Sequence, residues 1–221
     1  MLRLIGMKSE YGALPRIEEK GLRNCQYEAE VNFENSIRKG HKKALAVLAT
    51  GSGKTYLACL AAYRQLNYTQ TGRVLFLADR NNLARQAETE FKLFDRTEKQ
   101  QPLNDLYTIN RLTKPDKINS DIVISTIQKL FAVLTGQKID DIDEDEEDEK
   151  SFISDEKNEP EVKLSDNLKL SPDHFQFIIV DECHRSIYGK WQSVLKYFKG
   201  AKILGLTATP TLEAYAFFNN N

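Results

Sequence analysis

Five short apolar runs alternate with helix-like segments along this chain, and the alternation constrains its fold more than any other feature. The runs are rich in valine, isoleucine and leucine, which is typical of strands buried on both faces of a sheet. They are ALAVLA (44–49), VLFLA (74–78), DIVIS (121–125), FIIVD (177–181) and ILGLT (203–207). Segments with helical spacing lie between most of them, at 55–66, 81–94 and 190–198. This pattern predicts an α/β fold in which a mainly parallel sheet is sandwiched between helices, with ligands gathering at the carboxyl ends of the strands.

Two regions depart from this alternation. Residues 1–20 are expected to be irregular, and a helix is expected to follow from about residue 23 to residue 38. Residues 136–172 show little periodicity and include the run DDIDEDEEDE at 140–149, so we expect a disordered surface insertion there. The insertion is either a solvated segment without a function of its own or a DNA-mimicking flap that covers a basic surface.

The formal net charge of -1 hides an uneven distribution of 31 basic and 32 acidic residues. Residues 140–161 contain 13 acidic and two basic side chains, a local net charge of -11, which leaves the rest of the chain at +10. A basic body favours a polyanionic partner such as nucleic acid.

The three cysteines are far apart, odd in number and without a C-x-x-C pair, which argues against a disulfide framework and against a zinc ribbon. No stretch approaches the roughly 18 apolar residues that span a bilayer, and the N-terminus lacks the apolar core of a signal peptide. We therefore expect a cytoplasmic protein with no membrane partner.

The strongest chemical signal is ATGSGKT at 49–55, which directly follows an apolar run and directly precedes a helical segment. In this context glycines let consecutive backbone N–H groups approach phosphate oxygens at a helix N-terminus. Lys54 would reach the β- and γ-phosphates of ATP, and the Thr55 hydroxyl would bind Mg²⁺. Leu48 stands where the general phosphate-loop pattern has its first glycine. The predicted nucleotide-binding residues of the loop are Thr50, Gly51, Ser52, Gly53, Lys54 and Thr55.

The second signal is DECH at 181–184, at the end of the FIIVD run. An acidic pair at a strand end is by itself more often a solvated terminus, but an NTPase needs such a pair opposite its phosphate loop. Asp181 can hold Mg²⁺ through water, and Glu182 can orient and deprotonate the attacking water. We therefore predict that Lys54, Asp181 and Glu182 are catalytic, with ATP and Mg²⁺ as cofactors.

Several segments resemble motifs of the superfamily 2 helicases and translocases. ATGSGKT, DECHRS (181–186) and LTATP (206–210) are similar to motifs I, II and III. GLRNCQYEA (21–29), LFLADRNNLARQ (75–86) and ISTIQKL (124–130) resemble the adenine-reading entry segment, motif Ia and motif Ib. The combination of ADRNNLARQ, DECHRSIYGKW and GLTATP is most similar to the motor of type I restriction enzyme restriction subunits.

The resemblance implies that residues 21–218 form a single RecA-like P-loop NTPase domain, the first of two motor lobes, with the second lobe absent from this length. It implies ATP-driven translocation along double-stranded DNA, with methyltransferase and specificity subunits as partners in the full-length protein. Because the catalytic arginine of motif VI belongs to the second lobe, this lobe alone is expected to hydrolyse ATP weakly or not at all.

The resemblance also implies roles for residues outside the phosphate loop. Gln26 would read the adenine edge, and three residues of motifs II and III would couple the nucleotide state to the grip on DNA. Two residues of motifs Ia and Ib would lie on the nucleic-acid face. The coupling residues are His184, Thr207 and Thr209, and the nucleic-acid residues are Arg80 and Thr126.

Other functions stay open at this point. The chain could be a different superfamily 2 member, a DNA repair helicase or an RNA helicase, although ADRNNL and TAT differ from the PTREL and SAT of DEAD-box RNA helicases. It could also be a non-catalytic scaffold module whose acidic loop docks a basic partner. Two D-x-K matches, at 148–150 and 155–157, lie in the acidic insertion rather than on a strand, so we expect no nuclease activity.

Overall fold

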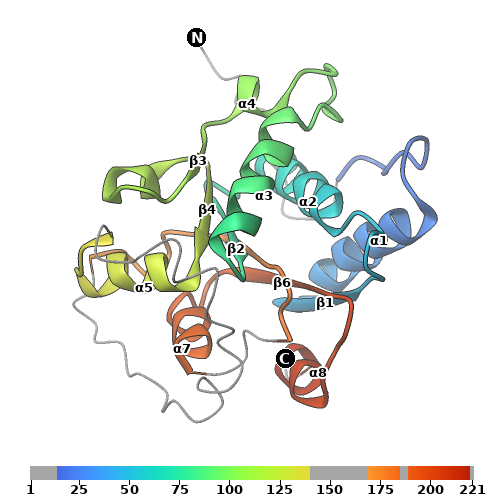
Figure 1. The fold of residues 1–221 in the computed structure, drawn as a ribbon. Coiled ribbons are helices and arrows are strands. Elements are labelled where there is room, and N and C mark those ends of the chain that lie inside the picture. The colour runs from blue at the N-terminus through green and yellow to red at the C-terminus, as the bar shows by residue number, and fades with distance from the viewer. Residues whose placement is uncertain (1–13, 140–168, 185–188, 220–221) are drawn as a thin grey trace.

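The computed structural model describes residues 14–139, 169–184 and 189–219, and in these residues six strands form one parallel sheet (Figure 1). The strand order is β1-β6-β5-β2-β4-β3, so β1 and β3 are the edge strands. The strands are β1 (Lys43–Val47), β2 (Val74–Ala78), β3 (Ile109–Arg111), β4 (Ile122–Thr126), β5 (Phe177–Val180) and β6 (Lys202–Thr207). The predicted α/β fold with a parallel sheet is confirmed.

Helices cover both faces of this sheet (Figure 1). Alternate strand residues point to opposite faces, and in β2 Val74 and Phe76 pack on one face whereas Leu75 and Leu77 pack on the other. One face carries α1 (Asn24–Arg38), α2 (Lys54–Tyr68), α3 (Asn81–Leu93) and α4 (Leu103–Leu106). The other carries the 3-10 helix η1 (Pro115–Asn119), α5 (Ile127–Thr135), α7 (Gly189–Tyr197) and α8 (Leu212–Asn219).

The observed elements differ from the predicted ones at a few boundaries. β5 ends at Val180, so Asp181 lies in the turn after the strand rather than in it. β1 ends at Val47, two residues before the predicted run does. The sequence pattern missed β3, because three residues, INR, make no apolar run, and it also missed α8.

The flanks of the predicted insertion at 136–172 belong to the folded domain. Gly136 ends α5 in the left-handed conformation, with φ of 78°. Ile139 and Leu170 are both buried in the core on the α5 side of the sheet. The acidic run lies outside the described residues, so the structure does not test the expectation that it is disordered. The N-terminal segment that was expected to be irregular is described from residue 14 to residue 20. Two of its side chains, Leu14 and Ile17, are buried.

Candidate active site

The loop between β1 and α2 has the backbone conformation that its glycines permit. Gly51 and Gly53 have φ of 75° and 84°, in the left-handed region that disfavours side chains. Ser52 N donates to Ala49 O over 3.1 Å, which closes the turn, and Gly53 is the N-cap of α2. The loop therefore meets the N-terminus of α2, where unpaired N–H groups and the helix dipole favour an anion. Lys54 and Thr55 begin that helix, and Thr50 is exposed on the loop.

A second element supports this loop from α1. The Gln26 amide nitrogen donates to the backbone oxygens of Ser52 (3.0 Å) and Gly53 (3.2 Å), and its amide oxygen accepts from Arg23 N (3.0 Å). The Arg23 guanidinium donates to Gly51 O. Gln26 is only 5% exposed. Both ends of its amide are thus engaged by protein, so reading an adenine edge would require it to exchange its bonds with the loop.

The acidic pair after β5 faces the loop. Lys54 Nζ lies 3.4 Å from Glu182 Oε1, and Glu182 adopts a left-handed conformation with φ of 45°. Asp181 is held in place by its own N–H, which donates to Leu77 O of β2, and by the Glu182 N–H, which donates to Asp181 Oδ1. Burial, with the negative charge of Glu182 beside it, raises the pKa of Asp181 to about 6. Burial thus favours the protonated form of Asp181, and a bound cation would favour its carboxylate form.

Two residues of motifs I and II carry oxygen atoms of the kind that Mg²⁺ prefers. The Thr55 hydroxyl, at the start of α2, and the Asp181 carboxylate, in the turn after β5, are hard oxygen donors. In the described part of the chain, no group of three or more histidine, cysteine or acidic side chains converges as a metal site. Magnesium usually keeps water and phosphate ligands beside one or two protein ligands, so these two residues fit it together with a nucleotide.

Motifs II and III are joined by short contacts. His184 Nδ1 lies 2.9 Å from Thr207 Oγ1 and 3.4 Å from Glu182 Oε2. Thr207 is fully buried, and its Oγ1 also accepts from Thr209 N over 3.1 Å. The structure thus brings the predicted coupling residues together in a chain of contacts that starts at Lys54.

The two residues predicted for the nucleic-acid face lie at the carboxyl ends of neighbouring strands. Arg80 is partly exposed as the N-cap of α3, with its Nε 3.6 Å from Asp79 Oδ2. Thr126 is 1% exposed, and its side chain accepts from Lys129 N as the N-cap of α5. The Thr126 hydroxyl could therefore reach a phosphate only if its neighbours moved.

Sequence reasoning missed a polar cluster beside these residues. Asn81 Oδ1 accepts from Arg111 Nη1 (2.9 Å) and from Lys129 Nζ (3.2 Å), and Arg111 Nε lies 3.5 Å from Glu88. Lys129 is 2% exposed. The sequence offered one signal for this cluster, Lys129 inside the apolar run IQKLF. Arg111 gave no signal, because it lies on β3, which is too short to form an apolar run.

The chain is similar to several known proteins. The model of the family described as type III restriction enzyme, res subunit, matches residues 19–212. The endonuclease subunit of the type I restriction enzyme EcoAI from Escherichia coli is 30% identical over 195 residues, which are 86% of this chain and 20% of that subunit. The EcoKI endonuclease subunit, also from Escherichia coli, is 28% identical over 92% of this chain and 16% of its own length. The chain therefore spans about a fifth of the length of these relatives.

Solved structures share the fold. A fragment of an HsdR subunit of a type I restriction enzyme from Vibrio vulnificus matches with a TM-score of 0.53 and 21% identity, over 94% of this chain and 30% of that one. The helicase domain of Hef from Pyrococcus furiosus matches with a TM-score of 0.56 and 22% identity, over 90% of this chain and 37% of that one. In the described residues, no helix is both long and apolar enough to cross a membrane.

The family model and these curated relatives are all described as restriction enzyme subunits. They also confirm the resemblance that the motifs indicated. The chain belongs to the family described as type III restriction enzyme, res subunit, and is similar to the endonuclease subunits of type I restriction enzymes over about a fifth of their length.

Proposed function

We propose that this chain is the ATP-binding motor lobe of a translocase that moves along double-stranded DNA, as part of a type I restriction enzyme. The observation that carries the proposal is the 3.4 Å contact between Lys54 of the phosphate loop and Glu182 after β5. In this contact a lysine at the start of α2, which would bind phosphate, meets a carboxylate in the turn after β5, which would orient the attacking water. Phosphoryl transfer needs both groups.

In the proposed mechanism, Lys54 leaves Glu182 and binds the β- and γ-phosphates as ATP enters the loop. Glu182 is then free to orient a water molecule in line with the γ-phosphate and to accept its proton. Thr55 and Asp181 would hold Mg²⁺, which when bound neutralises charge that develops on the phosphate oxygens. Gln26 and Arg23 keep the loop carbonyls turned away from the phosphates, because they already bind those carbonyls.

The contact chain offers a route from hydrolysis to DNA. Glu182 touches His184, which contacts Thr207, which in turn fixes the backbone of Thr209. A movement of Glu182 on ATP binding would thus shift the segment after β6. Arg80 would bind the DNA backbone, and such phosphate contacts position a protein without reading sequence. Recognition of the DNA target would belong to the specificity subunit, which with the methyltransferase subunit would complete the complex.

Substitution of Lys54 tests the proposal. We expect Lys54→Ala to lower the affinity for a fluorescent ATP analogue with Mg²⁺ by at least about tenfold, because it removes a charge-assisted contact to phosphate. Lys42→Ala is the matched control, since it removes an exposed lysine one residue before β1 and should leave the affinity unchanged. Equal affinities of the wild type and Lys54→Ala would reject nucleotide binding at this loop.

Hydrolysis is a separate readout. The isolated lobe should hydrolyse ATP slowly, and joining it to a second motor lobe should give DNA-dependent hydrolysis that Glu182→Gln abolishes. Full hydrolysis without DNA would contradict the coupling. Binding of a protein partner that ignores both nucleotide and Lys54→Ala would favour the scaffold function instead.

A further inference from the structure

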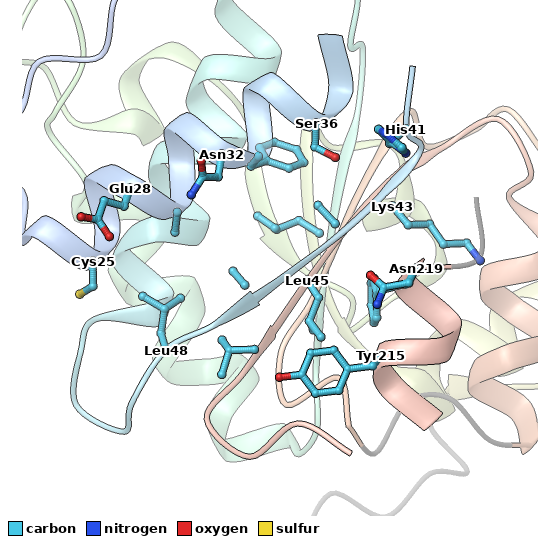
Figure 2. Close-up of a pocket in the computed structure, with 17 residues that line it drawn as sticks. Cys25, Glu28, Asn32, Ser36, His41, Lys43, Leu45, Leu48, Tyr215 and Asn219 are labelled. Carbon is cyan, nitrogen blue, oxygen red and sulfur yellow. The ribbon is translucent and has the colours of Figure 1, made fainter. Parts of the chain in front are cut away.

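A polar cluster of Asn81, Arg111 and Lys129 joins the elements that carry the two residues predicted for the nucleic-acid face. These two residues are Arg80 and Thr126, which lie at the carboxyl ends of the paired strands β2 and β4. Through Arg111 the cluster also reaches the edge strand β3. The open groove along the other edge strand, β1, has a volume of about 710 Å³ and is lined by none of the cluster residues (Figure 2).

Lys129 binds both elements. Its backbone N–H donates to the Thr126 hydroxyl over 3.5 Å, at the N-terminus of α5. Its side chain crosses to α3, where Nζ donates to Asn81 Oδ1 over 3.2 Å. Asn81 is the first residue of α3 and directly follows Arg80, which is the N-cap of that helix. One residue therefore ties the start of α5 to the start of α3.

Asn81 is held in one orientation. Its Oδ1 accepts from two cations, Lys129 Nζ and, over 2.9 Å, Arg111 Nη1. Its buried Nδ2 has no hydrogen-bond partner among the described residues. Turning the amide over would bring Nδ2, which is a donor, against two other donors. The backbone that leads from Arg80 into α3 is therefore fixed relative to α5 and β3.

A cluster of this kind is a poor source of stability. Apolar side chains of similar size often stabilise a protein interior as well as buried charged groups do, because a buried cation loses its hydration. Lys129 is 2% exposed, and the other buried residues of α5 are all apolar. A charged cluster supplies what an apolar one does not, namely a directed contact between particular atoms. Such a contact can orient a neighbouring side chain.

We propose that Lys129 is a positioning residue for nucleic acid: through Asn81 it fixes the start of α3, and thereby the direction in which Arg80 meets a DNA phosphate. The inference rests on the proposed function, in which Arg80 binds the DNA backbone. Lys129 and Asn81 are 2% and 1% exposed, so neither side chain is placed to touch DNA itself. Removing their contact should therefore act through Arg80, which distinguishes positioning from a direct phosphate contact.

A double-mutant cycle between Lys129 and Arg80 tests the inference, with binding of the chain to a short fluorescent DNA duplex followed by anisotropy. Arg80→Ala should weaken binding by about eightfold at about 0.1 M salt, because each phosphate contact contributes about -0.9 to the slope of log K against log[salt]. Lys129→Met keeps the length of the side chain, removes its charge and should weaken binding by a similar factor. Added to Arg80→Ala, it should weaken binding by less than about twofold, because the residue through which it acts is gone.

Two further variants separate positioning from a general loss of charge. Asn81→Leu breaks the same contact without changing the net charge and should reproduce both results of Lys129→Met. Lys92→Met removes a partly exposed lysine of α3 that pairs with Glu88, outside the contact with Asn81, and should bind DNA like the wild type. Circular dichroism would show that each variant keeps the helix content of the wild type.

Each failure has its own pattern. The inference is overturned, and the proposed function left intact, if Arg80→Ala binds DNA weakly while Lys129→Met and Asn81→Leu bind like the wild type. It is also overturned if the effects of Lys129→Met and Arg80→Ala multiply, because Lys129 would then act by another route. If the wild type binds no DNA, or if Arg80→Ala binds like the wild type, the proposed DNA contact fails and this inference fails with it.

Discussion

Glu30 of α1 makes the stability of this domain depend on pH in an unusual direction. It is fully buried, neither of its carboxylate oxygens has a hydrogen-bond partner among the described residues, and Arg64 Nε lies 4.0 Å from Oε1. That distance is at the limit of an ion pair, and Arg64 is engaged at 2.5 Å by Glu34. Burial therefore dominates, and with the nearby charge of Glu34 it raises the pKa of Glu30 from 4.5 to about 8.

The direction of the pH dependence follows from the direction in which the pKa of Glu30 is shifted. The folded state holds the Glu30 proton more tightly than the unfolded state does. The contribution of this proton to the free energy of unfolding is therefore fully present below pH 4.5 and is lost as the pH rises through about 8. With a pKa of 4.5 in the unfolded state and about 8 in the folded state, ionisation of Glu30 lowers the free energy of unfolding by roughly 3 kcal/mol between pH 5 and pH 8. Well above pH 8 the loss would approach about 5 kcal/mol.

Glu30→Gln is the direct test, because glutamine has nearly the same shape and does not ionise. Urea unfolding of the wild type and the variant at several pH values between 5 and 9 would give the difference in the free energy of unfolding. We expect the free energy of unfolding of the variant, relative to that of the wild type, to rise by roughly 3 kcal/mol between pH 5 and pH 8. Glu28→Gln, which changes an exposed carboxylate on the same helix, should show no such trend. A difference between Glu30→Gln and the wild type that stays constant with pH would refute the reasoning.

Two further substitutions test the packing and capping around the site. Gly205→Ala should lower the free energy of unfolding by about 1–3 kcal/mol, because its methyl group would come within 2.8 Å of Cys183 Sγ and would press into the Phe218 ring. Adding Phe218→Leu to this variant should restore part of the loss. An unchanged thermal midpoint in Gly205→Ala would argue against this packing. Thr126→Ala should cost about 1 kcal/mol by removing the N-cap of α5, whereas Thr126→Ser, which keeps the hydroxyl, should cost less in the same urea unfolding assay.

Much of the fold could be predicted from local pattern. Strands buried on both faces make continuous apolar runs, and the five predicted runs correspond to β1, β2, β4, β5 and β6. Periodicity fails where an element is short or does not alternate, as with the three residues of β3. It also cannot set the strand order, since pairing β1 with β6 depends on contacts between residues about 160 positions apart in the chain.

The phosphate loop and the acidic pair were readable from sequence because phosphate binding needs glycines and a lysine at fixed spacing, and that spacing is local. The roles assigned to them remain predictions. Only the tertiary structure decided which atoms meet: that Lys54 contacts Glu182, that Gln26 binds the loop carbonyls, and that Thr126 turns inward. The same holds for the buried carboxylate of Glu30 and for the open edge of β1. A sequence determines which elements can form, whereas burial, pKa and free edges depend on what packs around each residue from distant parts of the chain.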